Sequence, residues 1–224
     1  MLDWTKISTV LLDMDGTILD LHFDNHFWLH HLPLRYSENN NISLTLAKEK
    51  LKSHYQQVEG TIDWYCLDYW AKQTKLSITD LKKEVQHLIR LRDDAHDFLT
   101  ALRESGREIV LVTNAHPDSL SLKIERTELN QYFDTLYSTH EFGVTKESQL
   151  LWQRLQTKHG FELENTLFVD DSLTILDSAK KYGIKHLLAV ANPDSQQVDN
   201  VIEDYPSITD FRELIKAIRR TSLS

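Results

Sequence analysis

The sequence predicts an α/β protein whose core is a doubly wound, Rossmann-like parallel sheet carrying an inserted helical unit. One observation is that short apolar runs, rich in β-branched residues, alternate with helical segments. Such runs are typical of strands that are buried on both faces of a parallel sheet. A second observation is a repeated order of helix, glycine and strand, and a third is that residues 21–92 contain no convincing strand.

The expected strands all lie outside the inserted unit, at residues 7–12, 108–113, 135–138, 166–169 and 186–190. Three of them follow a helical segment that ends in a glycine, namely Gly106, Gly160 or Gly183. A glycine just beyond a helix takes the positive φ that closes the last turn, so these positions indicate where the helices stop. We therefore expect helices and strands to alternate through right-handed crossovers.

The inserted unit is expected to be helical. The apolar pattern predicts helices at residues 23–31, 43–59, 64–75 and 79–91, with the polar stretch 37–41 as a loop. A connection from a strand to the next helix normally takes only a few residues, so this segment is an insertion above the carboxyl end of the first strand. We expect a core of residues 1–20 and 93–224 and a helical unit of residues 21–92.

The composition excludes several classes of protein. The formal net charge of −9 argues against a nucleic-acid polymer as a partner. Cys66 is the only cysteine, which rules out a disulfide framework and favours a reducing compartment. The N-terminus lacks the basic region of a signal peptide, and no apolar run approaches the roughly 20 residues of a membrane helix. We expect a cytoplasmic protein that does not bind membranes, and the oligomeric state stays open.

Polar side chains follow the expected strands at the points where they end. They are Asp13-Met14-Asp15-Gly16-Thr17, then Thr113-Asn114, then Lys146 in the loop after the third strand, and Asp170-Asp171-Ser172. In an open α/β sheet, ligands bind outside the carboxyl ends of the strands. These clusters are therefore expected to meet in one acidic crevice although they lie far apart in the sequence.

An acidic crevice of this kind suits phosphoryl transfer. Carboxylate oxygens that leave room for water favour Mg²⁺, which shares its coordination with a substrate phosphate. The cation, Lys146 and the backbone N–H groups after Thr113 would offset the phosphate charge without a glycine-rich phosphate loop, which the sequence lacks. Aspartate is a known nucleophile for this chemistry, so Asp13 is the expected nucleophile. Asp15 is placed to act as acid and base, because repulsion and the metal push the two pKa values apart.

The four clusters, in this order, resemble the four motifs of the haloacid dehalogenase-like hydrolase superfamily. The helical insertion after the first motif is similar to the C1 cap of that superfamily. The resemblance implies that Asp13 is the nucleophile and a Mg²⁺ ligand. It also implies that Asp15 is the general acid and base, with its backbone carbonyl on the metal.

The remaining roles follow from the same resemblance. Thr113 is expected to bind the phosphate, with Asn114 also at the substrate, and Lys146 to orient both the nucleophile and the phosphate. Asp171 aligns as the side-chain ligand of Mg²⁺. Asp170 lies beside it and is expected either to bind the metal directly or to contact a residue that does. The reaction implied is hydrolysis of a phosphate ester through an aspartyl-phosphate.

Further segments resemble the bacterial nucleotidases of this superfamily that act on GMP and IMP. The segments are Phe23-Asp24-Asn25, Phe27-Trp28 and residues 64–70, 113–117 and 192–195. This resemblance covers nearly the whole chain and implies hydrolysis of purine nucleoside 5′-monophosphates to nucleoside and phosphate. One departure is Glu147, which follows Lys146 where many members of the superfamily have a proline.

Each cluster also has an ordinary structural interpretation. Aspartate and glycine after a strand favour turns and helix caps, and most lysines are solvated. The coincidence of all the clusters favours catalysis. For the aromatic residues 64–70 we expect packing inside the helical unit rather than stacking on a purine. His116 suits a substrate contact and a structural role equally, and Cys66 is expected to be a small core residue.

Three other functions are considered. The first is a phosphatase of the same superfamily for a sugar phosphate, phosphoglycolate or another small phosphate ester. The second is a nucleotide-binding regulator without catalysis, which the complete set of motifs opposes. The third, a dehalogenase, is disfavoured because Asp15 supplies an acid that dehalogenation does not need.

Overall fold

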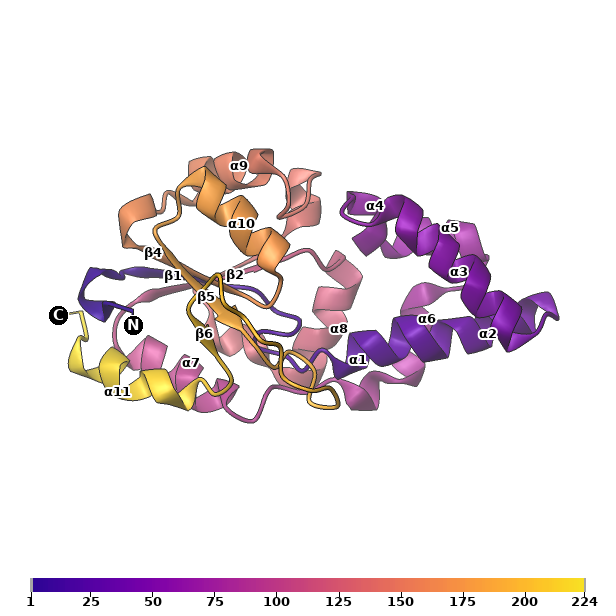
Figure 1. The fold of residues 1–224 in the computed structure, drawn as a ribbon, viewed down its shortest axis with the longest axis horizontal. Coiled ribbons are helices and arrows are strands. Elements are labelled where there is room, and N and C mark those ends of the chain that lie inside the picture. The colour runs from indigo at the N-terminus through magenta and orange to yellow at the C-terminus, as the bar shows by residue number, and fades with distance from the viewer. Residues whose placement is uncertain (1, 224) are drawn as a thin grey trace.

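The computed structural model describes residues 2–223, which form a sheet-based core and a separate group of helices (Figure 1). The sheet has six parallel strands in the order β3-β2-β1-β4-β5-β6. The strands are β1 (Thr9–Leu12), β2 (Glu108–Thr113), β3 (Thr135–Ser138), β4 (Thr166–Asp170), β5 (His186–Val190) and β6 (Ser207–Ile208). This order confirms the doubly wound sheet, and the winding reverses between β1 and β4.

Five of the six strands lie where the sequence places them. The first begins at Thr9 rather than at residue 7, and β4 continues to Asp170. The sixth strand is not predicted, because Ser207 and Ile208 are too few residues to show a pattern. It pairs with β5 at the edge of the sheet.

Helices cover both faces of the sheet, as the near-continuous apolar strands require (Figure 1). One face packs against α9 (Gln149–His159) and α10 (Leu173–Tyr182), and the other against α7 (Ala95–Glu104) and α11 (Arg212–Arg220). Successive strand residues alternate between the two faces. Leu11 packs on the side of α9 and α10, and Val10 and Leu12 pack on the side of α7 and α11. Every helix in the described part of the chain is too short or too polar to cross a membrane.

The remaining core elements connect these layers. They are α8 (Pro117–Thr127) and the short 3-10 helices η1 (Trp4–Lys6), η4 (Leu129–Tyr132), η5 (Thr139–Phe142) and η6 (Leu163–Asn165). Gly106, Gly160 and Gly183 have φ values of 75°, 91° and 111°, which confirms that they close helices as the sequence predicts.

The inserted segment is helical and has an apolar core of its own. It contains α1 (His22–His26), the π-helix η2 (Phe27–His31), α2 (Leu32–Asn40), α3 (Leu44–Val58), α4 (Ile62–Tyr65), α5 (Leu67–Thr74), α6 (Ile78–Glu84) and the 3-10 helix η3 (Gln86–Leu88). Phe23, Phe27 and Trp70 are buried at its centre, and Leu122 of α8 joins them. Figure 1 shows this group beyond the carboxyl ends of the strands, at the opposite end of the molecule from both termini.

The boundaries inside the helical group differ from the expectation. The predicted loop at residues 37–41 is wrong, because α2 continues to Asn40. Its polar side chains bond back to the helix: Ser37 Oγ donates to Leu34 O (2.7 Å) and Asn40 Nδ2 to Tyr36 O (2.9 Å). The helix predicted at 64–75 is interrupted at Cys66, and the one predicted at 79–91 ends at Glu84.

Two chain segments join the core to the helical group and run side by side. Asp20 N donates to Arg90 O (3.1 Å), and Arg92 N donates to Ile18 O (3.0 Å). The Asp20 carboxylate accepts hydrogen bonds from Arg90 Nη2 (2.7 Å) and from the backbone N of Ser195 (3.1 Å). This buried carboxylate therefore holds both connecting segments against the loop after β5.

Replacing Asp20 with asparagine is expected to lower the free energy of unfolding at neutral pH by about 1 kcal/mol, and the loss should disappear in acid. Burial alone would raise the pKa of Asp20, but hydrogen bonds from Ser195, His22 and Arg90 outweigh it and lower the pKa to about 2. The unfolded value is about 3.9, so this stabilisation is complete above about pH 4 and is lost as the pH falls towards 2. Urea unfolding of both proteins across that range checks the prediction, and a difference independent of pH would contradict it.

Candidate active site

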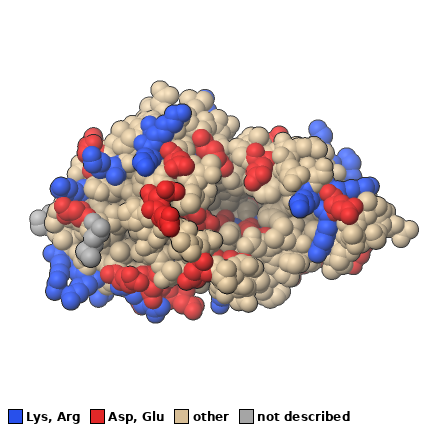
Figure 2. Space-filling view, viewed as in Figure 1, with Lys and Arg blue, Asp and Glu red and all other residues tan. Residues whose placement is uncertain are grey.

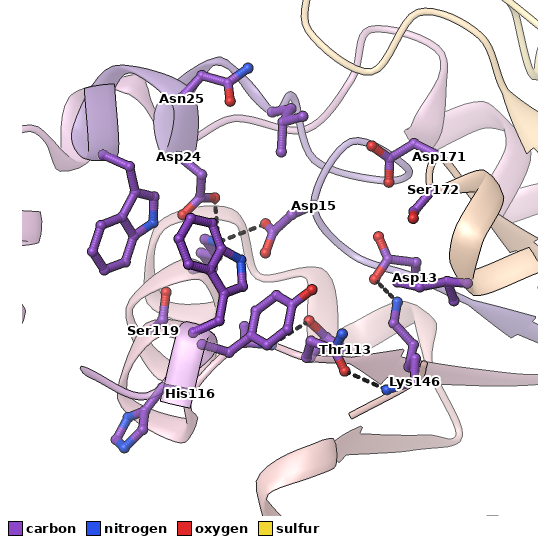
Figure 3. A pocket seen from close by; sticks show the side chains of 18 of the residues that line it. Asp13, Asp15, Asp24, Asn25, Thr113, His116, Ser119, Lys146, Asp171 and Ser172 are labelled. Atoms are coloured by element: carbon purple, nitrogen blue, oxygen red, sulfur yellow. Dashed lines mark hydrogen bonds and ion pairs between the residues drawn. The ribbon is translucent and has the colours of Figure 1, made fainter. Parts of the chain in front are cut away.

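Two adjacent strands deliver the central carboxylates. Asp13 directly follows β1 and Asp170 ends β4, at the point where the winding of the sheet reverses. Lys146 Nζ donates to Asp13 Oδ1 and to Asp170 Oδ2, the latter at 2.7 Å, and Figure 3 shows Lys146 directed at Asp13. One oxygen each from Asp13, Asp170 and Asp171 lies within 4.8 Å of the others. The structure thus brings together these four residues from three distant parts of the sequence.

The charges in this cluster do not balance, because three carboxylates face a single ammonium group. Burial raises the pKa of Asp13 to about 6, with Lys146 opposing the rise and Asp170 adding to it. Burial, and then the charges of Asp170 and Asp13, raise the pKa of Asp171 well above its usual range. For Lys146, burial lowers the pKa, but Asp13 and Asp170 outweigh this and raise it, so the ammonium stays charged. A cation among the carboxylates would relieve their repulsion.

Gly16 allows Asp171 to approach the loop after β1. Its φ is +84°, a backbone conformation that residues with a side chain rarely adopt. A Cβ at this position would lie 2.6 Å from Asp171 Oδ2 and 3.0 Å from Pro193 Cβ. The glycine between Asp15 and Thr17 is therefore required by the close packing of the fourth motif against the first.

Replacing Gly16 with alanine is expected to displace the Asp171 carboxylate and to lower the activity of this site at least tenfold. The reason is the overlap of the new Cβ with Asp171 Oδ2. Gly143→Ala is the matched control, because its φ is +68° but a Cβ there meets no atom of the described residues within 4 Å. Both variants carry about 1–3 kcal/mol of backbone strain. Equal loss of activity in both variants would show that the contact with Asp171 is unimportant.

The second motif lies beside Lys146. Thr113 ends β2, and its Oγ1 accepts from Ala115 N (3.0 Å). Asn114 Oδ1 accepts from Lys146 N (2.9 Å) and from Thr139 Oγ1 (3.1 Å). Both residues line the central cavity, as the sequence predicts, but the Asn114 amide is engaged with the protein and holds the loop that carries Lys146.

Glu147 links the core to the helical group. Its carboxylate accepts from Asn114 Nδ2 (3.1 Å) and from Tyr65 Oη (3.0 Å), the latter extending from the end of α4. Burial, and then the charge of Glu147, raise the pKa of the Tyr65 hydroxyl, so the hydroxyl stays a donor. The residue at which the sequence departs from the common pattern thus makes a contact between the two parts of the protein.

A second buried network surrounds Asp15. Lys123 Nζ, from α8, donates to Asp15 Oδ1 (2.6 Å) and to Asp24 Oδ2 (2.7 Å), and Lys82 Nζ donates to Asp24 Oδ1 (2.8 Å). Both lysines are about as buried as apolar core residues, at 1% and 2% exposed. Asp24 and Lys82 belong to the helical group, whereas Asp15 and Lys123 belong to the core. The network therefore connects the candidate acid to the inserted helices.

The two carboxylates in this network differ in protonation. Burial raises the pKa of Asp15 to about 6, opposed by Lys123 and reinforced by Asp24. Burial also acts to raise the pKa of Asp24, but Lys123 and Lys82 together hold it well below its usual range. Asp24 therefore keeps its charge, and within this network Asp15 is the carboxyl able to carry a proton. The pKa of Asp13 is raised to the same value, about 6, so without a cation the pKa values of Asp13 and Asp15 are not separated as the sequence predicts.

A cavity of about 320 Å³ joins the acidic cluster to the helical group, a size typical of small-molecule sites. Figure 2 shows it as a hollow between the two parts of the molecule, with acidic side chains visible inside. Its far side is aromatic and includes Trp28, Tyr55, Trp64 and Tyr65. The rings of Trp28 and Trp64 lie 6.4 Å apart at 23°. Trp70 is fully buried, as the expected core packing of the aromatic segment requires, whereas Trp64 is half-buried and lines the cavity.

Comparison with protein families matches residues 7–183 to the haloacid dehalogenase-like hydrolases. The chain belongs to this family. It is 44% identical over 215 residues to GMP/IMP nucleotidase YrfG of Escherichia coli, covering 96% of this chain and 97% of the relative. It is 22% identical to (S)-2-haloacid dehalogenase of Pseudomonas putida, over 80% and 82% of the two chains. The structure of a HAD phosphatase from Thermococcus onnurineus matches 97% of this chain and 100% of that one, with a TM-score of 0.80 and 23% identity.

Family membership confirms the resemblance drawn from the four motifs. Together with the 44% identity to a nucleotidase, it supports the expected class of enzyme, a hydrolase of phosphoric monoesters. In this haloacid dehalogenase-like hydrolase, every motif residue expected at the site lines the cavity: Asp13, Asp15, Thr113, Asn114, Lys146, Asp170 and Asp171. Their individual roles are taken up below.

The residues that join the two parts of this hydrolase are not evident from the sequence. None of the four motifs contains Lys123, Lys82 or Asp24. A lysine on a helix is normally solvated, so neither lysine suggests a buried ion pair. The only available signal was indirect: Asp24 lies in a segment that resembles the nucleotidases, without a role attached to it. Glu147 stands out in the sequence as a departure from the common pattern, and the structure shows its partners, Asn114 and Tyr65.

Proposed function

We propose that this protein is a Mg²⁺-dependent phosphatase that hydrolyses purine nucleoside 5′-monophosphates, GMP and IMP first, to nucleoside and phosphate. The observation that carries the proposal is a cavity with the Asp13, Lys146 and Asp170 cluster at one end and an aromatic surface at the other. The purine preference also draws on the 44% identity to a protein named GMP/IMP nucleotidase.

The acidic cluster fits a magnesium ion. Three carboxylates crowd together with one lysine, their pKa values are raised by burial and mutual repulsion, and all the donor atoms are oxygens. Asp13 and Asp171 would hold the ion, together with the backbone carbonyl of Asp15, and Asp170 lies beside them. When bound, the cation would neutralise charge on the phosphate and on the nucleophile.

The side chains support a two-step displacement. A carboxylate oxygen of Asp13 attacks phosphorus, and the bond from phosphorus to the nucleoside 5′-oxygen breaks as Asp15 gives that oxygen its proton. Asp15 then takes a proton from water, whose oxygen attacks phosphorus and breaks the bond to Asp13, releasing inorganic phosphate. Lys146 orients Asp13 throughout, Thr113 binds the phosphate, and Asn114 holds the loop of Lys146 at the substrate side.

We further propose that residues 21–92 act as a cap over a core of residues 1–20 and 93–224. The connecting segments at Asp20 and Arg90 form the hinge, and closure would exclude bulk water from the aspartyl-phosphate. Lys123 and Glu147, each bonded across the boundary, support a closed arrangement.

Release of inorganic phosphate from GMP, IMP, AMP, glucose 6-phosphate and phosphoglycolate, with and without Mg²⁺, tests the proposal. We expect the highest kcat/KM with GMP or IMP and no turnover after chelation. A higher kcat/KM with a sugar phosphate or phosphoglycolate would contradict the proposed substrate but not the proposed phosphatase activity. Binding of GMP without any phosphate release would instead indicate a nucleotide-binding regulator.

Replacing Trp64 with leucine is expected to lower kcat/KM for GMP about tenfold, mostly through KM. Stacking of a base on an aromatic ring is worth about 1–3 kcal/mol, and Trp64 lines the aromatic end of the cavity. Acetyl phosphate, which has no base, should be turned over at an unchanged rate. Trp64→Phe keeps a ring and is the control. A similar loss with both substrates would mean that Trp64 only supports the packing of Tyr55 and Trp70.

A further inference from the structure

We propose that Cys66, His116 and His140 form a second metal site, which binds Zn²⁺ or a similar cation at the contact between the helical group and the core. One donor atom from each residue lies within 4.8 Å of the other two. Cys66 lies between α4 and α5, His116 caps the N-terminus of α8, and His140 lies in η5. The site thus draws one ligand from the helical group and two from the core.

The donor atoms distinguish this site from the acidic cluster. A thiolate and two imidazoles are ligands that select zinc and similar cations, whereas Mg²⁺ prefers oxygen. Figure 3 shows His116 at the edge of the cavity, directed away from Asp13 and Asp171. The two sites should therefore be occupied by different metals.

His140 supplies an independent observation. Its Nε2 is buried and has no hydrogen-bond partner among the described residues. A buried polar atom without a partner is costly and calls for an explanation, such as a bound ion. The ring of His140 also packs edge-to-face against the ring of His116, with an interplanar angle of 76°. Its centroid is 5.0 Å from that of His116.

His116 would bind through Nε2. In the metal-free protein its Nδ1 accepts from Asp118 N (3.2 Å), which leaves the proton of the neutral ring on Nε2. On metal binding that proton moves to Nδ1, which breaks the hydrogen bond from Asp118 N, and Cys66 loses its thiol proton to solvent. Asp118 Oδ2, at 3.9 Å from Nδ1, must come closer to accept the new N–H. Asp68 Oδ2 lies 3.7 Å from Nε2 on an exposed side chain and is the candidate fourth ligand.

Binding requires a small contraction. Zinc bonds of roughly 2.0–2.3 Å place tetrahedral donors roughly 3.3–3.8 Å apart. The three donor atoms lie within 4.8 Å of one another, so their separations need to shrink by at most about 1.5 Å. Cys66 moves with the start of α5, because its Sγ accepts from Tyr69 N. The cation would thereby tie the helical group to the core and slow turnover. This last consequence rests on the proposed function, whereas the binding itself does not.

Titration of the purified full-length protein with Co²⁺ tests the site. Cys66 is the only cysteine, so a sulfur-to-cobalt charge-transfer absorption can come from this residue alone. We expect the band to appear at one equivalent, to be displaced by Zn²⁺, and to persist in Asp171→Asn, which disables the acidic cluster. Absence of the band, or its loss in Asp171→Asn, would overturn the proposal.

Matched variants then assign the ligands by calorimetric Zn²⁺ binding. Cys66→Ser keeps an acceptor for Tyr69 N but removes the soft donor, and His140→Gln removes the unpartnered nitrogen. Each variant should weaken Zn²⁺ binding by at least roughly 10–100-fold. That is the typical loss when a residue that hydrogen-bonds to a metal ligand is removed, and loss of the ligand itself should cost no less. His96→Gln, an exposed histidine elsewhere, should bind like the native protein. Unchanged affinity in Cys66→Ser and His140→Gln would refute the site.

The effect on turnover has its own test. Inhibition of Mg²⁺-supported hydrolysis by Zn²⁺ should be relieved in Cys66→Ser. Inhibition that persists there would refute only the claim that the cation slows turnover by tying the helical group to the core.

Discussion

Replacing Asp13 with asparagine is expected to lower phosphatase activity by about 10⁵-fold, because an amide oxygen cannot form the aspartyl-phosphate. The variant should fold. Asn keeps the size of the side chain, and Lys146 keeps Asp170 as its partner at 2.7 Å. Circular dichroism and urea unfolding check the fold, and phosphate release from GMP measures the loss.

The control for this experiment is Asp210→Asn, a carboxylate that pairs with Arg212 on the surface and does not line the cavity. It should retain native activity. If Asp13→Asn kept more than a small percentage of the native rate, direct attack by water would be the better mechanism, and Asp13 would be only a metal ligand.

Replacing Lys123 with methionine is expected to lower the free energy of unfolding by about 3–5 kcal/mol and to lower activity strongly. Lys123 is 1% exposed and pairs with both Asp15 and Asp24. Removing one member of a buried ion-pair network leaves the others uncompensated. Asp15 would also lose the contact that fixes its orientation at the site. Urea unfolding and kcat for GMP give the two readouts.

Two further variants test whether the loss in Lys123→Met comes from the buried ion-pair network. In the double variant Lys123→Met with Asp24→Asn, the removal of one buried negative charge should recover part of the lost stability. Lys158→Met is the surface control, because its pair with Glu141 is half-exposed and solvent screens it. A loss no larger in Lys123→Met than in Lys158→Met would show that the buried network contributes little.

The fold could be predicted because its signals are local and repeated. Each buried strand is a short apolar run, and Gly106, Gly160 and Gly183 mark the helix ends with a conformation that favours glycine. Prediction was wrong where the signal was weak. Ser207 and Ile208 are too few to show a pattern, and the polar residues of α2 satisfy their hydrogen bonds on the helix itself.

The candidate site likewise has one part that the sequence predicts and another that it does not. Asp13, Thr113 and Asp170 stand at strand ends, so the rule that parallel strands present their carboxyl ends at one edge was enough to bring them together. The close approach of Gly16 to Asp171 could not be seen in the sequence, since both residues also fit an ordinary turn and helix cap.

The sequence by itself determined the sheet, the inserted helices and the acidic cluster with its lysine, because each depends on residue type and on position relative to a strand. Only the tertiary structure decided that Lys123 and Lys82 are buried ion-pair partners, and that Glu147 contacts Tyr65. A lysine is charged wherever it lies, and its burial depends on which distant elements pack around it. That packing joins residues as far apart as Asp15 and Lys123, and no local pattern records it.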